Sequence, residues 1–385
     1  MQSLRVHAQR AIARSGSLSL SSVVVRPASS VSSFSVRRFA SASAALPKTN
    51  LVARYEKFGP VDTVVKLREE PIEEIKPNQV LLQFLAAPIN PADINMIEGS
   101  YSIQPPLPAI GGNEGVARVV SVGSAVKGLA VDDWVIPASP GFGTWRKYAV
   151  CDSEAVDPIP RDGVPLELAA TISVNPCSAY RMLHDYVPLK AGDLVVQNGA
   201  NSSVGMAVIQ LCKHMGVRTL NVVRDRPNLA ELKARLESLG ADLVITEEEL
   251  ANTRAINEAM SKFDGKKPVL GLNCVGGNSA ADIARLLKDG SSMVTYGGMS
   301  RKPVCVPTGR LIFNDVALRG FWLSRWTETH GKAERRAMID ELMTLIRDKE
   351  FKTFVQLKPF EEFEQALAVA RQGFKEGKVV LTYLN

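Results

Sequence analysis

Acidic side chains are missing from the amino-terminal part of this 385-residue chain, whose first acid is Glu56. Residues 1–50 instead contain six arginines and thirteen serines. An arginine-rich, serine-rich segment without acids is typical of a mitochondrial transit peptide. We therefore expect residues 1–45 to be such a peptide and the protein to work in the mitochondrial matrix. A disordered basic tail is the alternative, but it does not account for the missing acids.

Long hydrophobic runs and a strong net charge are also missing from the rest of the chain. The formal net charge is +6, and the first 50 residues hold seven basic side chains without an acid, so the remainder is close to neutral. A nearly neutral body has no electrostatic reason to bind a nucleic-acid backbone. No apolar run approaches the ~20 residues that a membrane helix needs. We therefore expect neither a nucleic-acid partner nor a membrane span.

Closely spaced cysteines and histidines are absent as well. The nearest two of the five cysteines are Cys151 and Cys177, which lie far apart in the chain. This spacing excludes a CxxC redox motif and a structural zinc lobe built from cysteines. The four histidines do not approach metal-ligand spacing either. We expect five free thiols and no metal site.

What remains is a chain of ordinary globular composition, with 45% hydrophobic residues, whose pattern changes near residue 190. Residues 51–175 contain short strand-like runs between proline and glycine signals, such as 61–65, 80–85 and 115–123. These runs predict a barrel-like antiparallel domain. After residue 190, strand-like and helical segments alternate, which is typical of a doubly wound parallel sheet. The expected fold class is therefore α/β, with a β-rich domain before the parallel sheet.

The first turn of the alternating region lacks two of the three glycines in the dinucleotide-binding pattern G-x-G-x-x-G. A strand-like run over 193–199 is followed by residues 200–205 (ANSSVG) and then by a helix with an apolar face. The free amides and positive dipole end of such a helix bind an anion even without those glycines, and Ser202 and Ser203 add hydroxyl donors. Gly205 permits close packing of the helix on the strand. We expect a nucleotide here, with an empty structural turn as the alternative.

The end of the next strand carries two arginines where an NAD-binding unit has a single acid. The strand ends in Arg224, Asp225 and Arg226. Arginine holds a 2′-phosphate through paired, charge-assisted hydrogen bonds. The sequence therefore predicts NADPH rather than NADH as the coenzyme, with a solvated charged turn as the alternative.

The chain resembles the medium-chain dehydrogenase/reductase superfamily in four short motifs. These are residues 90–93 (NPAD), 111–115 (GGNEG), 199–205 (GANSSVG) and 296–299 (YGGM). Two further segments, 175–183 (NPCSAYRML) and 320–323 (GFWL), are more specific, and they resemble the mitochondrial enoyl thioester (enoyl-[acyl-carrier-protein]) reductases of that superfamily. The similarity covers essentially the whole chain from about residue 50 to residue 385.

This resemblance implies a particular division of the chain. Residues 50–176 form the first part of a GroES-like catalytic domain, and residues 177–324 form a Rossmann domain that binds NADPH. Residues 325–385 return to the catalytic domain. The resemblance also implies a homodimer, and the NADPH-dependent reduction of trans-2-enoyl thioesters, carried by acyl carrier protein or CoA, in mitochondrial fatty acid synthesis.

The resemblance is to a zinc-free branch of the superfamily. Zinc-dependent members carry Gly-His-Glu where this chain has Gly112, Asn113 and Glu114, and they carry a cysteine where the segment 90–93 has none. Without the imidazole and the thiolate, a catalytic zinc site cannot be assembled from these positions. The expected cofactor is therefore NADPH, without zinc.

The resemblance also implies roles for individual residues. The family's proton donor is a tyrosine that corresponds to Tyr101, whose ordinary pKa of ~10 keeps it protonated at neutral pH. The implied coenzyme contacts are Asn175 beside the nicotinamide; Asn201, Ser202, Ser203 and Val204 at the pyrophosphate; Arg224, Asp225 and Arg226 at the adenosine phosphate; Tyr296, Gly297, Gly298 and Met299 at the nicotinamide shelf; Phe321, Trp322 and Leu323 at the wall toward the acyl chain; and Lys378. A packing role is the alternative for Tyr101 and Trp322.

Two other functions stay open at this point. A quinone reductase of the zeta-crystallin type shares the fold and the coenzyme, and a catalytically silent nucleotide-binding protein shares the fold alone. The sequence gives neither the preferred acyl length nor the choice between acyl carrier protein and CoA thioesters. An acidic carrier protein would dock on basic side chains, for which the candidates are Arg301, Lys302, Arg319, Arg325 and residues 332–336.

Overall fold

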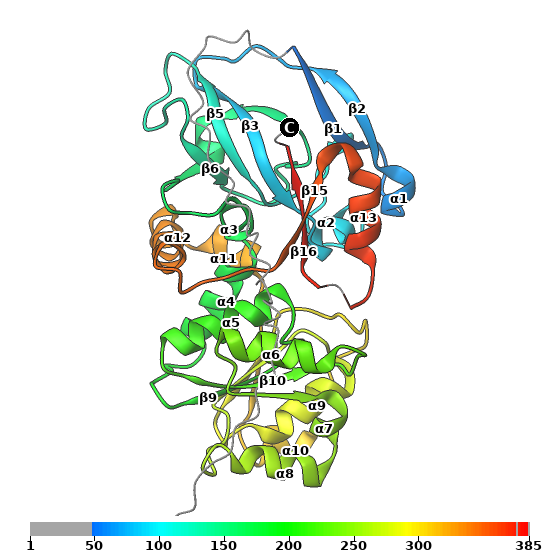
Figure 1. The fold of residues 1–385 in the computed structure, drawn as a ribbon, viewed down its shortest axis with the longest axis vertical. Coiled ribbons are helices and arrows are strands. Elements are labelled where there is room, and N and C mark those ends of the chain that lie inside the picture. Colours follow the sequence, from blue (N-terminus) through cyan, green and yellow to red (C-terminus); the bar gives the residue numbers. More distant parts are fainter. Residues whose placement is uncertain (1–47, 375, 384–385) are drawn as a thin grey trace, which may run out of the picture. The chain divides into compact units, whose positions relative to one another are not determined.

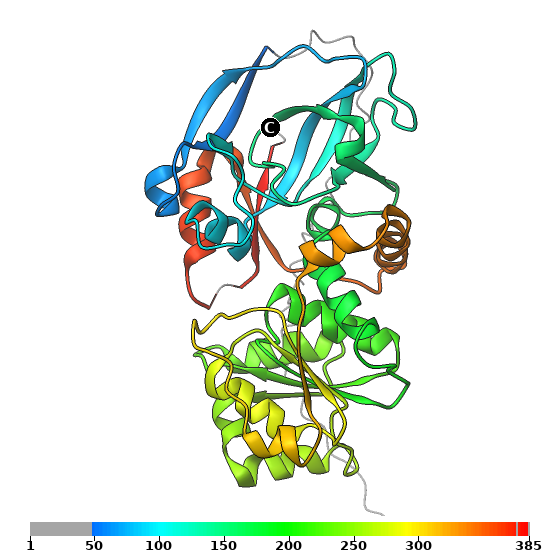
Figure 2. The same cartoon turned by 180° about the vertical axis from the view of Figure 1, so that it is seen from behind.

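The computed structural model describes residues 48–374 and 376–383, and Pro47–Asn385 form one compact unit (Figures 1 and 2). The expected transit peptide, residues 1–45, lies outside the described residues. The unit contains antiparallel β-sheets and a separate parallel sheet. This architecture confirms the expected α/β fold class with a β-rich part and a doubly wound sheet.

The β-rich part contains a three-stranded and a seven-stranded sheet. Its strands are β1 (Thr49–Tyr55), β2 (Lys66–Pro71), β3 (Gln79–Pro88), β4 (Ala109–Ile110), β5 (Val116–Val122), β6 (Trp134–Pro137), β7 (Tyr148–Asp152), β8 (Val156–Ile159), β15 (Val355–Pro359) and β16 (Lys378–Thr382). The small sheet has the order β2-β1-β4, and the large one has the order β15-β16-β3-β5-β6-β8, with β7 paired to β3. Except for β15 and β16, the paired strands run antiparallel.

One of the predicted strands is a helix. Residues 61–65 (VDTVV) have the β-branched composition of a strand, but Val61–Val64 form the short helix α1, which follows Pro60. The amides of Thr63 and Val64 donate to the Pro60 carbonyl at 2.9 and 3.0 Å. Val61 is fully buried in the core of the β-rich part. Tertiary packing therefore overrides the local strand preference here.

The carboxyl-terminal segment pairs with a strand from near the start of the chain. Strand β16 runs antiparallel to β3, with Val380 opposite Pro88 and Leu381 opposite Ala87. Helix α13 (Phe363–Arg371) contacts β15 and β16. Both views show these red elements beside the blue and cyan strands. The last part of the chain thus completes the large sheet of the β-rich part.

The parallel sheet has six strands in the order β11-β10-β9-β12-β13-β14. They are β9 (Leu194–Asn198), β10 (Arg218–Val223), β11 (Leu243–Thr246), β12 (Leu270–Asn273), β13 (Ser292–Thr295) and β14 (Ala317–Gly320). The helices of this part are α5 (Ser203–His214), α6 (Leu229–Leu239), α7 (Glu247–Ala251), α8 (Thr253–Ser261), α9 (Gly277–Leu286) and α10 (Thr308–Ile312). Helices α5 and α6 cover one face, while α8 and α9 cover the other (Figure 1). All five residues of β9 are buried, as is typical of a strand with both faces covered.

Gly205 has the role that the sequence predicts, and Gly240 is a second glycine whose conformation excludes most side chains. A Cβ on Gly205 would lie 2.5 Å from the carbonyl oxygen of Ala200, so a side chain there would push helix α5 away from the turn that precedes it. Gly240 follows α6 with φ +111°, in the left-handed region that ends many helices. Both positions therefore require a residue without a Cβ.

Five further helices lie at the junctions of these sheets. They are α2 (Pro91–Ile97), α3 (Leu166–Thr171), α4 (Asn175–His184), α11 (Leu323–Thr329) and α12 (Lys332–Arg347). Helix α4 packs against both α5 and α12, and side chains from both parts of the chain share one buried cluster. Among the described helices, none is long and apolar enough to cross a membrane.

Candidate active site

The turn after β9 presents the start of helix α5 at the carboxyl edge of the parallel sheet. Strand β9 lies between β10 and β12, so the winding of the sheet reverses beside this turn, where open α/β sheets bind ligands. Ser202 caps the helix, because its Oγ accepts a hydrogen bond from the Gly205 amide at 3.0 Å. Its hydroxyl hydrogen can still donate. The predicted contacts Asn201, Ser202, Ser203 and Val204 are all partly exposed at this turn.

Arg224 and Arg226 follow β10, the neighbour of β9. Arg226 is only 9% exposed, and in the part of the chain that the structure describes no ion pair joins either arginine to a carboxylate. The Asp225 carboxylate accepts a hydrogen bond from the backbone amide of Arg226 at 2.8 Å instead. A buried cation without a paired anion is costly. This corner of the sheet is therefore suited to a bound anion.

Tyr101 and Trp322 are in contact although 221 residues separate them in the chain. Trp322 Nε1 donates a hydrogen bond to the Tyr101 hydroxyl at 2.8 Å. The two rings meet edge to face, with centroids 6.1 Å apart. Tyr101 follows α2, and Trp322 lies between β14 and α11. The predicted proton donor and a predicted wall residue therefore form one pair across the two parts of the chain.

The surroundings of Tyr101 keep its phenol protonated. Burial raises the pKa of Tyr101 above its ordinary value of ~10, the hydrogen bond from Trp322 lowers it, and the charge of Asp93 adds to the increase. The net effect is a raised pKa. The indole N–H is already placed to stabilise the oxygen once its proton has left. The phenol therefore carries its proton at neutral pH, with a hydrogen-bond donor facing its oxygen.

A buried polar network contains Asp93, whose charge acts on Tyr101. Asp93 and Asn90 form a capping box on α2, in which Asp93 Oδ2 accepts a hydrogen bond from the backbone N–H of Asn90 at 2.7 Å. Asn90 Nδ2 donates to Glu114 Oε2 at 3.0 Å, and Asn90 Oδ1 accepts from Lys378 Nζ. Burial raises the pKa of Asp93 to about 7 and raises that of Glu114 above its ordinary value.

Neither Asp93 nor Glu114 is among the site residues predicted from the sequence. The available signal for Asp93 was the capping pattern N-x-x-D at the start of α2, which places its carboxylate on the Asn90 amide. Glu114 lies in the motif 111–115 that carries the resemblance, but its partners Asn90 and Val174 lie in other segments, so the local sequence does not show the network. Of the network members, only Lys378 was predicted.

Asn113 occupies the position where zinc-dependent members have a histidine. Its backbone amide and Nδ2 donate to Asp93 Oδ1 at 2.9 and 2.6 Å, and its Oδ1 accepts from the Gly141 amide at 2.6 Å. The side-chain amide is therefore committed to neighbours within the protein. Across residues 48–374 and 376–383, no group of three His, Cys, Asp or Glu side chains is arranged to hold a metal.

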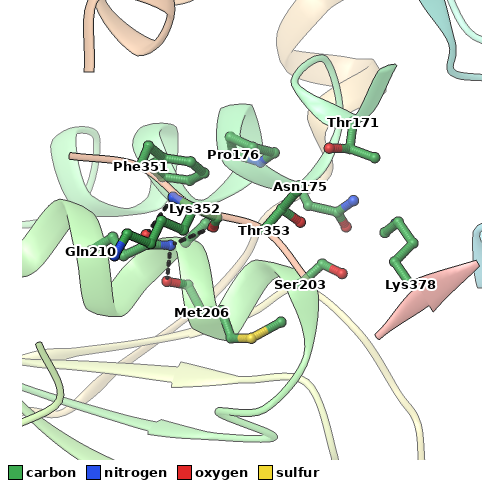
Figure 3. A pocket seen from close by; sticks show the side chains of 11 residues that line it. Thr171, Asn175, Pro176, Ser203, Met206, Gln210, Phe351, Lys352, Thr353 and Lys378 are labelled. Atoms are coloured by element: carbon green, nitrogen blue, oxygen red, sulfur yellow. Dashed lines mark hydrogen bonds between the residues drawn. The ribbon is translucent and has the colours of Figure 1, made fainter. Parts of the chain in front are cut away.

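A pocket beside helices α4 and α5 brings together three of the predicted coenzyme residues (Figure 3). Asn175, Ser203 and Lys378 line it, along with Gln210 and Thr353. The Nδ2 of Asn175 is buried and has no hydrogen-bond partner among the described residues. A buried donor without an acceptor is costly. This amide therefore fits a ligand oxygen, and the adjacent start of α5 fits a phosphate group.

Residues 296–299 follow β13, and Tyr296 lies beside Ser202 in the turn between β9 and α5. The Tyr296 hydroxyl is buried beside Cys274 and Ser202, and burial raises the pKa of Tyr296 well above its ordinary value. Gly297 lies against Cys274, whose carbonyl oxygen would be 3.3 Å from an added Cβ, whereas Gly298 is open. Met299 is 66% exposed.

The remaining predicted contacts flank Trp322. Phe321 and Leu323 are both partly buried. The ring of Phe321 meets that of Tyr186 edge to face at 6.5 Å, so part of its surface is used in packing. Trp322 itself combines packing with its hydrogen bond to Tyr101.

The basic residues considered for docking a carrier protein are exposed with one exception. Arg301, Lys302, Arg319 and Arg325 are exposed, as are Lys332 and Arg336. Arg335 is buried, where it pairs with Asp157 and donates to the Pro137 carbonyl at 2.9 Å. The inclusion of Arg335 in an exposed docking segment was therefore wrong, because this guanidinium bonds helix α12 to the β-rich part.

Two family models match the chain. "Alcohol dehydrogenase GroES-like domain" matches residues 76–161, and "Zinc-binding dehydrogenase" matches residues 203–344. A Homo sapiens protein, "Enoyl-[acyl-carrier-protein] reductase, mitochondrial", is 48% identical over 331 residues, which make up 85% of this chain and 87% of the human one. The two models thus cover the β-rich part and the parallel sheet, and the human relative spans both.

Solved structures of enoyl thioester reductases have the same fold as this chain. The Etr1p complex with NADP and crotonyl-CoA is 33% identical, with a TM-score of 0.81 over 87% of this chain and 100% of the other. The mitochondrial 2-enoyl thioester reductase Etr1p/Etr2p heterodimer from Candida tropicalis is 35% identical, with a TM-score of 0.80 over 87% of this chain and 100% of the other. From its sequence and its fold, this chain belongs to the mitochondrial enoyl-[acyl-carrier-protein] reductases of the medium-chain dehydrogenase/reductase superfamily.

Proposed function

We propose that this chain reduces the double bond of trans-2-enoyl thioesters with NADPH, and that Tyr101 supplies the proton. The observation that carries this proposal is the 2.8 Å hydrogen bond from Trp322 Nε1 to the Tyr101 hydroxyl. It supports a role in which a buried, protonated phenol acts as the acid. The NADP and crotonyl-CoA bound to Etr1p support the same coenzyme and the same class of substrate.

The reaction needs a hydride at Cβ, a proton at Cα and stabilisation of the negative charge that develops on the thioester oxygen. NADPH supplies the hydride when it is bound. Tyr101 gives its hydroxyl proton to Cα. Burial holds the phenol in its protonated form until that step, and the Trp322 N–H stabilises the phenolate that remains.

The coenzyme is held by groups that keep free hydrogen-bond donors or lack a paired anion among the described residues. The first turn of α5, with Ser202 and Ser203, receives the pyrophosphate. Arg226, a buried cation, receives the 2′-phosphate together with Arg224. Asn175 offers its free Nδ2 on the nicotinamide side.

The other predicted contacts complete the path of the coenzyme in this proposal. These are Asn201, Val204, Asp225, Tyr296, Gly297, Gly298, Met299, Phe321, Leu323 and Lys378. We infer that the site works without zinc, because the amide of Asn113 is committed to Asp93 and Gly141 and an amide in that position does not replace an imidazole ligand.

We also propose a homodimer that forms through strand β14. This strand is an edge of the parallel sheet, and its residues Leu318, Arg319 and Gly320 are exposed. Nearby in the chain, Ile312 and Phe313 are exposed as well. An edge strand with exposed apolar neighbours is a template for pairing with a second copy. Pairing of two β14 strands would cover that edge.

The domain limits and the location are proposals of the same kind. Residues 50–176 and 325–385 form the catalytic domain, which is supported by the pairing of β16 with β3. Residues 177–324 form the NADPH-binding domain, which is supported by the six parallel strands ending with β14. The mitochondrial names of the relatives and the composition of residues 1–45 support the matrix as the site of action.

A substrate panel tests the function. Oxidation of NADPH and NADH by the purified protein is followed with 2-hexenoyl-CoA, with the matching acyl carrier protein thioester and with a soluble quinone. We expect turnover of both thioesters with NADPH, and slow turnover with NADH or the quinone. Faster reduction of the quinone would indicate a quinone reductase, and NADPH binding without any turnover would indicate a silent binding protein.

A further inference from the structure

We propose that Phe374 determines the preference for NADPH by fixing Arg224 and Arg226 in the orientation that receives a 2′-phosphate. Phe374 lies in the loop between α13 and β16, which belongs to the β-rich part, whereas the arginines follow β10 of the parallel sheet. The inference rests on the proposed function, and specifically on NADPH as the coenzyme. Because Phe374 acts through the arginines, it is a positioning residue.

The contacts of Phe374 hold both guanidinium groups. Its ring centroid lies 5.0 Å from Cζ of Arg224 and 5.2 Å from Cζ of Arg226. Both distances are within the range in which a cation is attracted to an aromatic face. The Phe374 carbonyl also accepts a hydrogen bond from Arg226 Nη2 at 2.8 Å, and Asn228 Oδ1 accepts from Arg226 Nε. Arg226 is thus held by a ring, a carbonyl and an amide.

This arrangement leaves the arginines able to bind a phosphate. The N–H groups of a guanidinium lie in its plane, so a ring that covers the face does not compete for them. In Arg226, the two hydrogen bonds use Nε and one hydrogen of Nη2. The remaining hydrogens on Nη1 and Nη2 form the fork that matches a phosphate.

The pair of arginines also needs an anion. Two guanidiniums against one ring repel each other, and Arg226 is 9% exposed without a carboxylate partner among the described residues. The negative face of the ring attracts both cations and lowers the cost of keeping them together. A doubly charged 2′-phosphate completes this arrangement, whereas the neutral 2′-hydroxyl of NADH does not.

The backbone of the loop adopts an unusual conformation at Phe374. Phe374 has φ +53°, a left-handed conformation that is uncommon for a residue with a bulky side chain. Such conformations persist where the surroundings over-determine them, and they cluster at ligand clamps. Beyond Phe374, the Glu376 carbonyl accepts from Arg235 Nη1 of helix α6 at 2.6 Å. The loop is therefore docked on the parallel-sheet part at two points.

Coenzyme binding to variants at Phe374 tests this positioning role without relying on turnover. Dissociation constants of the purified protein for NADPH, NADH and adenosine 2′,5′-bisphosphate are measured by fluorescence titration and displacement. Phe374→Leu loses two cation–π contacts. The dissociation constants for NADPH and the bisphosphate should therefore rise by about tenfold, and the one for NADH should stay within about twofold of the wild type. Phe374→Tyr keeps a ring face and should bind NADPH like the wild type.

Phe142→Leu is the matched control, because this ring lies 5.2 Å from Cζ of Arg146 and the Phe142 carbonyl accepts from Arg146 Nη2 at 3.0 Å, in the β-rich part. It should leave the ratio of NADPH to NADH affinity unchanged. Arg226→Ala and Phe374→Leu should be strongly non-additive for NADPH, since both act on the same phosphate contact. Additive effects would mean that Phe374 does not act through Arg226 and would overturn the proposal.

Two outcomes separate this inference from the proposed function. If the wild type prefers NADPH but Phe374→Leu leaves NADPH binding unchanged, or weakens NADPH and NADH equally, the positioning role is wrong and the coenzyme assignment stands. If the wild type binds NADH as tightly as NADPH, the coenzyme assignment itself is wrong, and the role of Phe374 is overturned with it.

Discussion

Burial acts on two ionisable groups of the candidate site in the same direction, with different consequences for charge. It raises the pKa of Tyr101, whose phenol is protonated at neutral pH in any case. It raises the pKa of Asp93 to about 7, so this carboxyl is partly protonated near neutral pH. Asp93 in turn raises the pKa of Tyr101 when it is charged. The acidity of the phenol is therefore coupled to the charge of Asp93.

Removal of the Tyr101 hydroxyl should separate catalysis from coenzyme binding. Tyr101→Phe keeps the ring but loses the proton, so kcat with 2-hexenoyl-CoA should fall by roughly a hundredfold or more. The dissociation constant for NADPH should stay unchanged. Tyr148→Phe is the control, because the Tyr148 hydroxyl meets Gln83 at 3.5 Å in the β-rich part. A kcat near that of the wild type in Tyr101→Phe would exclude the phenol as the acid.

Asp93 should make stability depend on pH. Its pKa of about 7 in the folded state lies above the ~3.9 of an unfolded chain. Between these values the folded state binds more protons than the unfolded state, so the free energy of unfolding should fall as pH rises from about 4 to about 7. Urea unfolding across this window should show a weaker pH dependence in Asp93→Asn. Asp162→Asn, at a fully exposed aspartate, should behave like the wild type.

At the scale of elements, the turn between β9 and α5 forms without two of the glycines of the pattern G-x-G-x-x-G. Ser202 provides the cap, and the close approach to Ala200 depends on the absence of a side chain at Gly205. The sequence predicts this helix well because its apolar face recurs with the helical period. It fails for α1, a single turn that is too short to show a period, where β-branched residues point to a strand.

Gly205 should tolerate no side chain. In Gly205→Ala the added Cβ would lie 2.5 Å from the Ala200 carbonyl oxygen, so α5 would have to shift. We expect a loss of about 1–3 kcal/mol in the free energy of unfolding and weaker binding of NADPH at the displaced helix start. Gly331→Ala is the matched control, because nothing lies within 4 Å of a Cβ there. Equal stability of the two variants would show that the turn can adapt.

At the scale of the whole molecule, the sheets decide which surfaces are left for other chains. The C-terminal strands β15 and β16 cover one side of β3, while β14 ends the parallel sheet without a neighbour on its outer side among the described strands. Exposed Leu318 lies on that outer strand. The edge is therefore the surface on which the proposed homodimer depends.

A charge on this edge should separate the dimer. Leu318 is 43% exposed, and burial of a glutamate in a strand pair would leave an unpaired charge in the interface. In size-exclusion chromatography with light scattering, we expect Leu318→Glu to have the mass of a monomer and the wild type to have the mass of a dimer. Val131→Glu, at an apolar residue that is 52% exposed in the β-rich part, should remain dimeric. A wild-type protein that is monomeric would rule out the dimer.

The sequence by itself determined that strands and helices alternate after about residue 190, that the first part is β-rich, and which family the chain resembles. These follow from hydrophobic periods, turn residues and short motifs, which are all local in the chain. It also pointed to Tyr101 and to the arginines after β10 as candidates for function.

Only the tertiary structure decided which of these residues meet. The contact of Tyr101 with Trp322 spans 221 residues, and the stacking of Phe374 on Arg226 joins two parts of the chain. Burial likewise sets the charge of Asp93, since a carboxylate in the same short motif would be ionised in water. Long-range packing and desolvation depend on the folded arrangement of distant segments, and no local pattern contains them.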